Sequence, residues 1–173
     1  MSTDFTPRQA LGVIDSPVVL LTSAADGMRN VMTVNMVMGV SFNPVLVAIS
    51  LNPGSFSHEL IERSGDFAIN VAGPDQISLV ERVGSAHGAE VDKFDDFGIV
   101  TKAAERVVAP LVDGCPAALE CRVIDTHPAG EHTVFIGHVV ALHRREGLPI
   151  FLYRGDYYEP GNKLGTFFKG EAA

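Results

Sequence analysis

Residues 50 to 58, SLNPGSFSH, form a segment whose residue types suit the binding of a phosphate group. The segment follows an apolar run and leads into a predicted helix, whose N-terminus offers free N–H groups and a partial positive charge. Ser50, Ser55 and Ser57 supply hydroxyls, and Gly54 permits a tight backbone. Ordinary N-capping favours the same residue types. Two serines around one helix start exceed what a cap requires, so we predict a phosphate site here.

The histidines raise the question of a metal site, because His127, His132, His138 and His143 lie close together in the sequence. On one strand, His132 and His138 share a face but stand roughly 20 Å apart at about 3.3 Å per residue. Ligands lie about 2 Å from a metal ion, so we predict no metal site. His132 follows a predicted turn at 128–131, which would bring its ring to the mouth of a cavity. A solvent-exposed histidine at a strand end is the alternative.

Lys93 lies in the acidic segment DKFDDFG, residues 92 to 98. Such a charge pattern is typical of a solvated turn. The flanking Phe94 and Phe97 can instead be buried on one side, which would hold Lys93 against an anionic or electron-poor group.

The stretch NVMTVNMVMGVSFNP, residues 30 to 44, places polar side chains in a segment patterned for burial. On a strand, Thr33 and Asn35 share one face, and Val34 lies on the other. Asn30 stands at the end of the strand, where either face is within reach. We therefore predict that Thr33 and Asn35 line a ligand slot, while Val34 and its apolar neighbours pack in a barrel or against a partner.

The elements that must position these residues are mostly strands. Short β-rich runs bounded by turn residues predict strands at 17–24, 30–36, 45–51, 67–72, 116–126, 132–143 and 149–154. Helices are predicted at 56–64 and 74–84, and Asp26-Gly27 predicts a hairpin. Seven strands at this spacing predict an antiparallel barrel or sandwich with helices at its edges. We find no repeat or linker, so we expect one domain over residues 1–173, with a core of about 10–160.

Composition excludes several classes of function. The chain carries 13 Lys and Arg against 21 Asp and Glu, a net charge of −8, which disfavours nucleic acid. No apolar run is long enough to span a bilayer, and residues 1–17 lack signal-peptide features, so we expect a cytoplasmic protein. Hydrophobic residues make up 46% of the chain, which favours self-association.

Familiar catalytic motifs are absent from the sequence. It contains no GxGxxG, GxxxxGK[ST], GxSxG or HExxH motif, so any nucleotide-like cofactor binds without a Rossmann fold or P-loop. Cys115 and Cys121 are spaced neither as a CxxC pair nor as a disulfide framework. We interpret them as reduced structural thiols.

The order of these pieces resembles the flavin reductase-like family, which has the FMN-binding split-barrel fold. This family includes flavoredoxins and the reductase components of two-component flavin monooxygenases. The resemblance runs from about Pro17 to Tyr158. It rests on PVVLLTSAADG, NVMTVNMVMGVSFNP, VLVAISLNPGSFSH, SGDFAINV, DKF, AALEC, EHTVFIGHVV and LPIFLYRGDYY, in that order.

The resemblance implies a mostly β, antiparallel split β-barrel of Greek-key type with peripheral helices. It also implies a homodimer with FMN, or FAD, at the subunit interface and NADH or NADPH as co-substrate. The cofactor-binding residues it implies are Asn30, Thr33, Val34, Asn35, Ser50, Leu51, Asn52, Ser55, Phe56, Ser57, Lys93, Phe94, His132 and Tyr157.

The resemblance also assigns roles to these residues. Asn30 and Thr33 would face the flavin ring or ribityl chain, and the segments 50–52 and 55–57 would hold the ribityl and phosphate. Lys93 would approach the phosphate or the polar edge of the ring. His132, the predicted catalytic residue, would stand where nicotinamide stacks.

Two departures from the family concern the residue that stacks on the flavin ring. Relatives often carry an aromatic residue near position 36, where this chain has Met36, and Trp is absent. Tyr157, Tyr158 and Phe167 are the candidates for this stacking role.

The implied function is an NAD(P)H-dependent flavin reductase that supplies reduced flavin to a partner monooxygenase. A flavoredoxin-like FMN electron carrier is the alternative. A split barrel that binds another planar cofactor, such as haem or a deazaflavin, is a third possibility.

Overall fold

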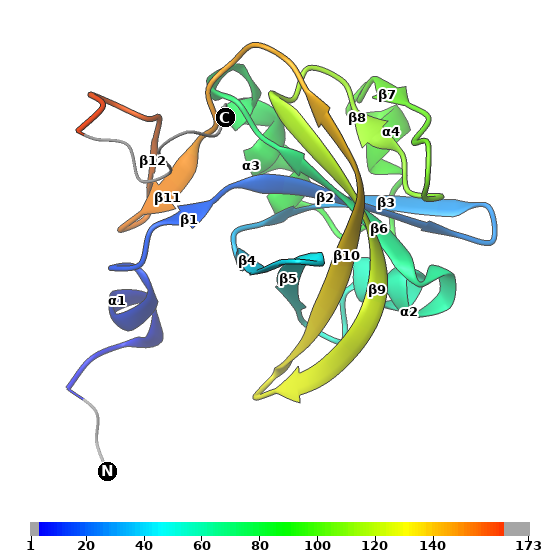
Figure 1. The fold of residues 1–173 in the computed structure, drawn as a ribbon, viewed down its shortest axis with the longest axis horizontal. Coiled ribbons are helices and arrows are strands. Elements are labelled where there is room, and N and C mark those ends of the chain that lie inside the picture. The colour runs from blue at the N-terminus through cyan, green and yellow to red at the C-terminus, as the bar shows by residue number, and fades with distance from the viewer. Residues whose placement is uncertain (1–3, 165–173) are drawn as a thin grey trace.

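A computed structural model describes residues 4–164 of the chain (Figure 1). Its strands are β1 (Ser16–Pro17), β2 (Val19–Ala25), β3 (Met28–Val34), β4 (Val37–Phe42), β5 (Val45–Leu51), β6 (Asp66–Val71), β7 (Thr101–Lys102), β8 (Leu111–Val112), β9 (Ala117–Ala129), β10 (His132–Arg144), β11 (Phe151–Tyr153) and β12 (Asp156–Tyr158). Its helices are α1 (Pro7–Leu11), α2 (Phe56–Ser64), the 3-10 turn η1 (Pro74–Gln76), α3 (Ile77–Ser85) and α4 (Lys93–Asp96).

Seven of the strands form one antiparallel sheet in the order β3-β2-β6-β9-β10-β5-β4. The two edge strands, β3 and β4, are consecutive in the chain and are joined by Asn35 and Met36. The N–H of Ser50 on β5 donates to the carbonyl of Met36 at 3.1 Å, which fixes this joint beside β5. The predicted mostly β, antiparallel split-barrel fold is confirmed.

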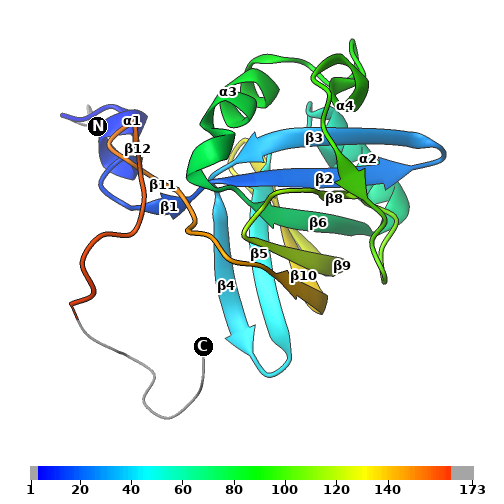
Figure 2. The same ribbon diagram turned by 90° about the horizontal axis from the view of Figure 1, so that it is seen from above.

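Two apolar clusters lie on opposite faces of the curled sheet. The inner cluster includes Leu21, Ile49, Phe67 and Phe135, all at most 1% exposed, which come from four different strands. The outer cluster lies beneath α3 and α4, which Figure 2 shows together on one side of β2 and β3. Strand β2 is therefore buried on both faces along its whole length.

The predicted helix at 56–64 coincides with α2. The Ser55 side chain caps it by accepting from the N–H of His58, and Gly65 ends it with φ +73°. The predicted helix at 74–84 is observed as η1 followed by α3. The hairpin prediction is also confirmed, because Asp26 and Gly27 both adopt the positive φ that a tight turn between twisted strands requires.

Three details of the predicted fold were wrong. Strand β4 was missed, because its exposed apolar residues and Gly39 do not alternate as a half-buried strand does. The turn predicted at 128–131 contains only Gly130 and Glu131, since β9 runs on to pair Ala129 with His132. The short elements α1, α4, β1, β7, β8 and β12 were also not predicted. Phe167 lies outside the described residues.

Candidate functional site

The corner where β3 passes into β4 collects several of the predicted site residues. Ser50 pairs with Val134 of β10 on one side and bonds to Met36 on the other. Neighbouring strands stand about 4.8 Å apart, so the start of β10 and the 35–36 joint lie within about 10 Å of each other. The register therefore brings Asn35, the 50–52 segment and the start of β10 at His132 to one end of the barrel.

The loop after β5 is shaped by its own hydrogen bonds. The Asn52 side chain accepts from the N–H of Gly54 at 2.8 Å, and the N–H of Ser55 donates to the Asn52 carbonyl at 3.0 Å. The Ser55 hydroxyl accepts from the N–H of His58 at 3.3 Å, which makes Ser55 the N-cap. The N–H groups at the start of a helix lack partners within it and are suited to an anion; at α2, Phe56 is partly exposed, whereas Ser57 is fully buried.

Ser57 is buried and is not a second cap. Its hydroxyl accepts from the Asn30 amide at 2.9 Å and from the Ser23 hydroxyl at 3.1 Å, and all three residues are at most 4% exposed. A side chain on Gly88 would clash with the Asn30 amide, so the 85–92 loop covers this network closely. The sequence argument counted Ser57 as a hydroxyl that capping does not need and that a phosphate could use. That argument was wrong for Ser57, because its hydroxyl bonds to buried Asn30 and Ser23.

The slot predicted between Thr33 and Asn35 does not form around Thr33. Its hydroxyl donates to the carbonyl of Val80 in α3 at 2.6 Å, which ties β3 to the helix above it. Val34 is buried in the inner cluster, as the strand pattern predicts. Asn35, just past the end of β3, instead lines a groove beside α1.

Lys93 is buried rather than solvated. It is 4% exposed, its ammonium donates to the carbonyl of Val83 at 2.9 Å, and burial lowers its pKa. Phe94, beside it, belongs to the outer cluster at 2% exposure. The solvated-turn alternative is therefore excluded, and the Lys93 ammonium has a partner within the chain.

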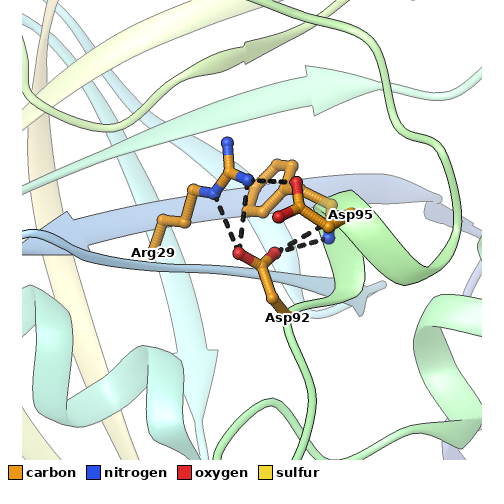
Figure 3. Close-up of polar contacts among 4 residues, drawn as sticks. Arg29, Asp92 and Asp95 are labelled. Carbon is orange, nitrogen blue, oxygen red and sulfur yellow. Dashed lines mark hydrogen bonds and ion pairs between the residues drawn. The ribbon is translucent and has the colours of Figure 1, made fainter.

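Arg29, which the sequence gave no reason to select, organises the surface of the same segment (Figure 3). Its guanidinium lies 4.7 Å from the centre of the Phe94 ring and contacts Asp92 at 3.2 Å and Asp95 at 2.7 Å. Burial alone would raise the pKa of Asp92, but hydrogen bonds from the Asp95 N–H and from Arg29 outweigh it and hold this pKa below its ordinary value. Arg29 thereby fixes α4 against β3.

His58 is a second residue that the sequence analysis missed. Its Nε2 lies 2.9 Å from the Thr133 hydroxyl, and its Nδ1 lies 3.4 Å from Glu62. The ring packs edge-on against Phe135 at 5.0 Å. His58 thus links α2 to the start of β10, next to half-buried His132. Within the described residues, no group of three or more His, Cys, Asp or Glu side chains could hold a metal ion.

Tyr157 on β12 is half-buried and packs against the outer cluster. Burial, and then the charge of Glu81, raise the pKa of its hydroxyl. The neighbouring Tyr158 is stacked on Phe151 at 6.2 Å. Of the three candidates for ring stacking, Tyr157 therefore packs on its own chain, and Tyr158 is the more exposed of the two tyrosines.

Two hollows lie at opposite ends of β3, one at the Asn35 corner and one at the β2–β3 turn. The groove lined by Asn35 has a volume of about 850 Å³ and also contacts α1 and the β11–β12 turn. A smaller pocket, of about 340 Å³, lies between Phe56 at the start of α2 and the 88–92 segment, with Arg29 on its wall. The predicted residues thus lead to two separate hollows rather than to one slot.

The two cysteines are free and buried. Burial raises the pKa of Cys115 to about 11 and that of Cys121 to about 12, so both remain neutral thiols near neutral pH. In the part of the chain that the structure describes, no helix is both long enough and apolar enough to cross a membrane.

Comparison with known proteins assigns this fold to a family. A model of the flavin reductase like domain matches residues 11–161. The chain is 32% identical over 155 residues to an NADH-dependent FMN reductase of Streptomyces nodosus subsp. asukaensis, a match that covers 87% of this chain and 81% of that protein. It is 32% identical over 150 residues to the reductase component of a 4-nitrophenol 4-monooxygenase/4-nitrocatechol 2-monooxygenase of Rhodococcus opacus, with 87% and 77% covered.

Solved structures agree with this placement. A homologue of nitrilotriacetate monooxygenase component B from Mycobacterium thermoresistibile superposes with a TM-score of 0.82 at 29% identity, covering 96% of this chain and 93% of that one. The sheet order and the neighbouring solved structure together define a split-barrel protein. The chain belongs to the flavin reductase-like family, as the resemblance of its sequence implied.

Proposed function

We propose that this chain is a flavin reductase that transfers hydride from NADH, or NADPH, to FMN. The observation that carries the proposal is the start of α2, where Asn52 and Ser55 shape a loop at the end of a barrel strand, inside a flavin reductase-like domain. The named relatives are an NADH-dependent FMN reductase and a monooxygenase reductase component. FAD is the alternative flavin.

The described residues fit a flavin in two respects. The start of α2 suits its phosphate, and the polar segment at 50–52 lies beside the 35–36 joint, whose Asn35 lines a groove. The flavin supplies N5 of its ring as the hydride acceptor. We assign the phosphate to Ser55 and the α2 start, the ribityl chain to residues 50–52, and the positioning of nicotinamide to His132.

Four of the predicted residues have an indirect role in this proposal: Asn30, Thr33, Ser57 and Lys93. Their polar side chains already form hydrogen bonds within the chain, so they support the residues that line the site and need not contact the ligand themselves. Direct contact of Lys93 with the flavin phosphate remains a prediction. It has a clear test, because Lys93→Met should weaken FMN more than riboflavin if the ammonium meets the phosphate, and both equally if it only holds the loop.

We further propose a homodimer in which the β4–β5 hairpin meets the partner subunit. The hairpin and the joint before it expose large apolar side chains, three of them on the edge strand β4: Met36 at 41%, Met38 at 63%, Val40 at 45%, Phe42 at 84% and Val45 at 50%. Soluble monomers rarely expose a contiguous apolar patch of this kind. Because the hairpin continues from the Asn35 corner, a dimer through it would place the flavin site beside the interface.

We also propose a partner protein and a cellular compartment for this reductase. The relative from Rhodococcus opacus is a reductase component of a monooxygenase, which supports a partner monooxygenase that receives reduced flavin. We propose that the protein acts in the cytoplasm, where free NADH is available and where its two thiols stay reduced.

The test is oxidation of NADH by the purified protein, with FMN, FAD or riboflavin added, followed through the absorbance of NADH. A reductase turns over NADH or NADPH with at least one of these flavins. Absence of turnover with every flavin would overturn the proposal. Yellow protein that keeps FMN through dialysis but oxidises neither nucleotide would identify the flavoredoxin-like electron carrier instead.

The proposed role of His132 has its own test. His132→Ala should lower turnover more than FMN affinity, because the ring is assigned to nicotinamide and not to the flavin. Unchanged kinetics would return His132 to the solvent-exposed strand end that the sequence offered as the alternative.

A further inference from the structure

The groove at Asn35 is assembled from the two ends of the described chain. Its lining is shared between α1 with the residues that follow it and the turn between β11 and β12. Figures 1 and 2 both place α1 against the β11–β12 hairpin, to one side of the barrel. The N–H of Arg154 donates to the Gly12 carbonyl at 3.0 Å, and β1 pairs with β11, so the two walls are fixed relative to each other.

The groove carries a concentration of positive charge in an acidic protein. Arg8 lines one wall and Arg154 the other, and no Asp or Glu is among the lining residues. Among the described residues, neither arginine takes part in an ion pair, whereas Arg29, Arg63 and Arg145 are all paired with carboxylates. Two such arginines on facing walls favour a ligand with at least one phosphate, which the guanidinium fork binds in a bidentate way.

The backbone at Arg154 gives a second reason to assign it a role in binding. Arg154 and Gly155 form the two-residue turn of the β11–β12 hairpin, with φ +54° and +94°. Asn, Asp or Gly is favoured at the first position of such a turn, because other side chains disfavour positive φ. Arginine is therefore a poor choice for folding here, and its guanidinium, 5.2 Å from the centre of the Tyr153 ring, stays at the rim of the groove.

The rest of the lining restricts the ligand further. Leu11, Val13 and Ile14 are each more than half exposed and give the groove an apolar wall suited to planar rings. Asn35 connects the groove to the corner assigned to the flavin. A ligand with planar rings at both ends and a diphosphate between them matches this arrangement, and the volume of about 850 Å³ is within the range of ligand pockets.

We propose that Arg8 and Arg154 bind the diphosphate of the nicotinamide dinucleotide, which lies in this groove with its nicotinamide toward Asn35. The assignment rests on the proposed function, because it names the place where that reaction's hydride donor binds. It makes both arginines binding residues for the co-substrate and not for the flavin.

The test uses ADP-ribose, which has the diphosphate but no nicotinamide, titrated calorimetrically into the FMN-loaded protein. The variants are Arg8→Gln, Arg154→Asn and the double variant. Each loses a charge, and Asn is also favoured in the turn. We expect the double variant to bind ADP-ribose at least about ten-fold more weakly, as loss of charge-assisted hydrogen bonds to phosphate implies. The melting temperature of Arg154→Asn should not fall.

A matched control is Arg144→Gln, which removes the same charge from an exposed arginine outside the groove. Its ADP-ribose affinity should stay close to that of the wild type. In turnover, the groove variants should raise KM for NADH with little change in kcat, the signature of lost uniform binding. The dissociation constant for FMN should be unchanged.

Three results would overturn the proposal: no binding of ADP-ribose by the wild type, equal weakening in Arg144→Gln, or unchanged affinity in the double variant. If the double variant instead becomes a smaller species and loses FMN, the groove seats a second copy of the chain. Failure of the proposed function looks different, because wild-type protein would then oxidise no NADH while ADP-ribose binding still responded to the arginines.

Discussion

Strands β3 and β4 are consecutive in the chain, yet their side chains lie in opposite environments. The polar residues of β3 are satisfied inside the molecule, Asn30 by Ser57 and Thr33 by the Val80 carbonyl. The apolar residues of β4 and its hairpin are exposed, with Met38 at 63%. The polar residues of β3 therefore form hydrogen bonds inside the molecule, and the apolar residues of β4 form a surface suited to a partner.

The reason for the contrast lies in what covers each strand. Strand β3 is covered by α2, α3, α4 and the 85–92 loop; the Ser57 hydroxyl of α2 and the Val80 carbonyl of α3 lie within reach of its side chains. Strand β4 is an edge strand that pairs only with β5 within the described chain. Polarity in a sequence therefore does not distinguish a ligand from a covering helix, because both satisfy the same groups.

The largest expected effect is on association. Met38→Asp combined with Val40→Asp should raise the dimer dissociation constant at least about 100-fold, since two charges would be desolvated in the interface. Sedimentation velocity at several concentrations measures it. Val100→Asp is the control, because Val100 is 67% exposed and lies away from the hairpin. A monomeric wild type, or a dimer that persists in the double variant, would show that the exposed apolar residues of β4 do not form a dimer interface.

Asn30→Ala tests the interior of β3. It leaves the buried Ser57 and Ser23 hydroxyls without the amide, so we expect the free energy of unfolding to fall by about 2 kcal/mol. Asn35→Ala is the matched control five residues further on, and it should change stability by less than about 0.5 kcal/mol. Urea denaturation of both variants measures the difference. Equal effects would show that the two asparagines do not differ in environment.

Thr33→Val removes the hydrogen bond to Val80 while keeping the shape of the side chain. The expected loss of stability is about 1 kcal/mol, the usual contribution of one such bond. Thr126→Val, at an exposed position on β9, is the control and should cost less. If Thr33→Val left stability intact but weakened flavin binding, Thr33 would belong to the cofactor site after all.

The smallest expected effect is the pH dependence from Lys93. Burial lowers its pKa below 10.5 in the folded protein, so the folded state carries a penalty while the ammonium is charged. That penalty is present below the folded pKa and is relieved as the pH rises through it toward 10.5. Wild-type stability should therefore rise with pH in this window relative to Lys93→Met. Lys163→Met, at an exposed residue, should run parallel to the wild type.

Much of the fold could be predicted because its signals are local. A serine cap and a left-handed glycine bound α2, and Asp26-Gly27 specifies the β2–β3 turn. Strand β4 could not be recognised, because its apolar side chains are mostly exposed and do not alternate with polar ones as those of a half-buried strand do.

The site residues were harder to predict, because some are far apart in the sequence and others are covered by elements that the sequence pattern does not place. The pairing of β10 with β5 places Thr133 and Val134, which follow His132, opposite Leu51 and Ser50. Asn30, Ser57 and Lys93 were selected as polar residues among apolar ones, without the information that α3 and the 85–92 loop cover them. Arg8 and Arg154, which we propose as binding residues, could not be selected from the sequence because they lie near opposite ends of the chain and meet only through the fold.

The two-residue joint between β3 and β4 has one more consequence, for how well this chain tolerates insertions and deletions. The opposite edges of the sheet meet where the chain passes directly from one to the other, at Asn35 and Met36. The turn at residues 43–44 holds β4 in register with β5, so a residue inserted or deleted at this seam has only two residues in which to be absorbed. If it instead shifted β4 by one position, every β4 side chain would change face, and exposed Met38 would turn inward. The length of this joint is therefore constrained as tightly as the identity of its residues.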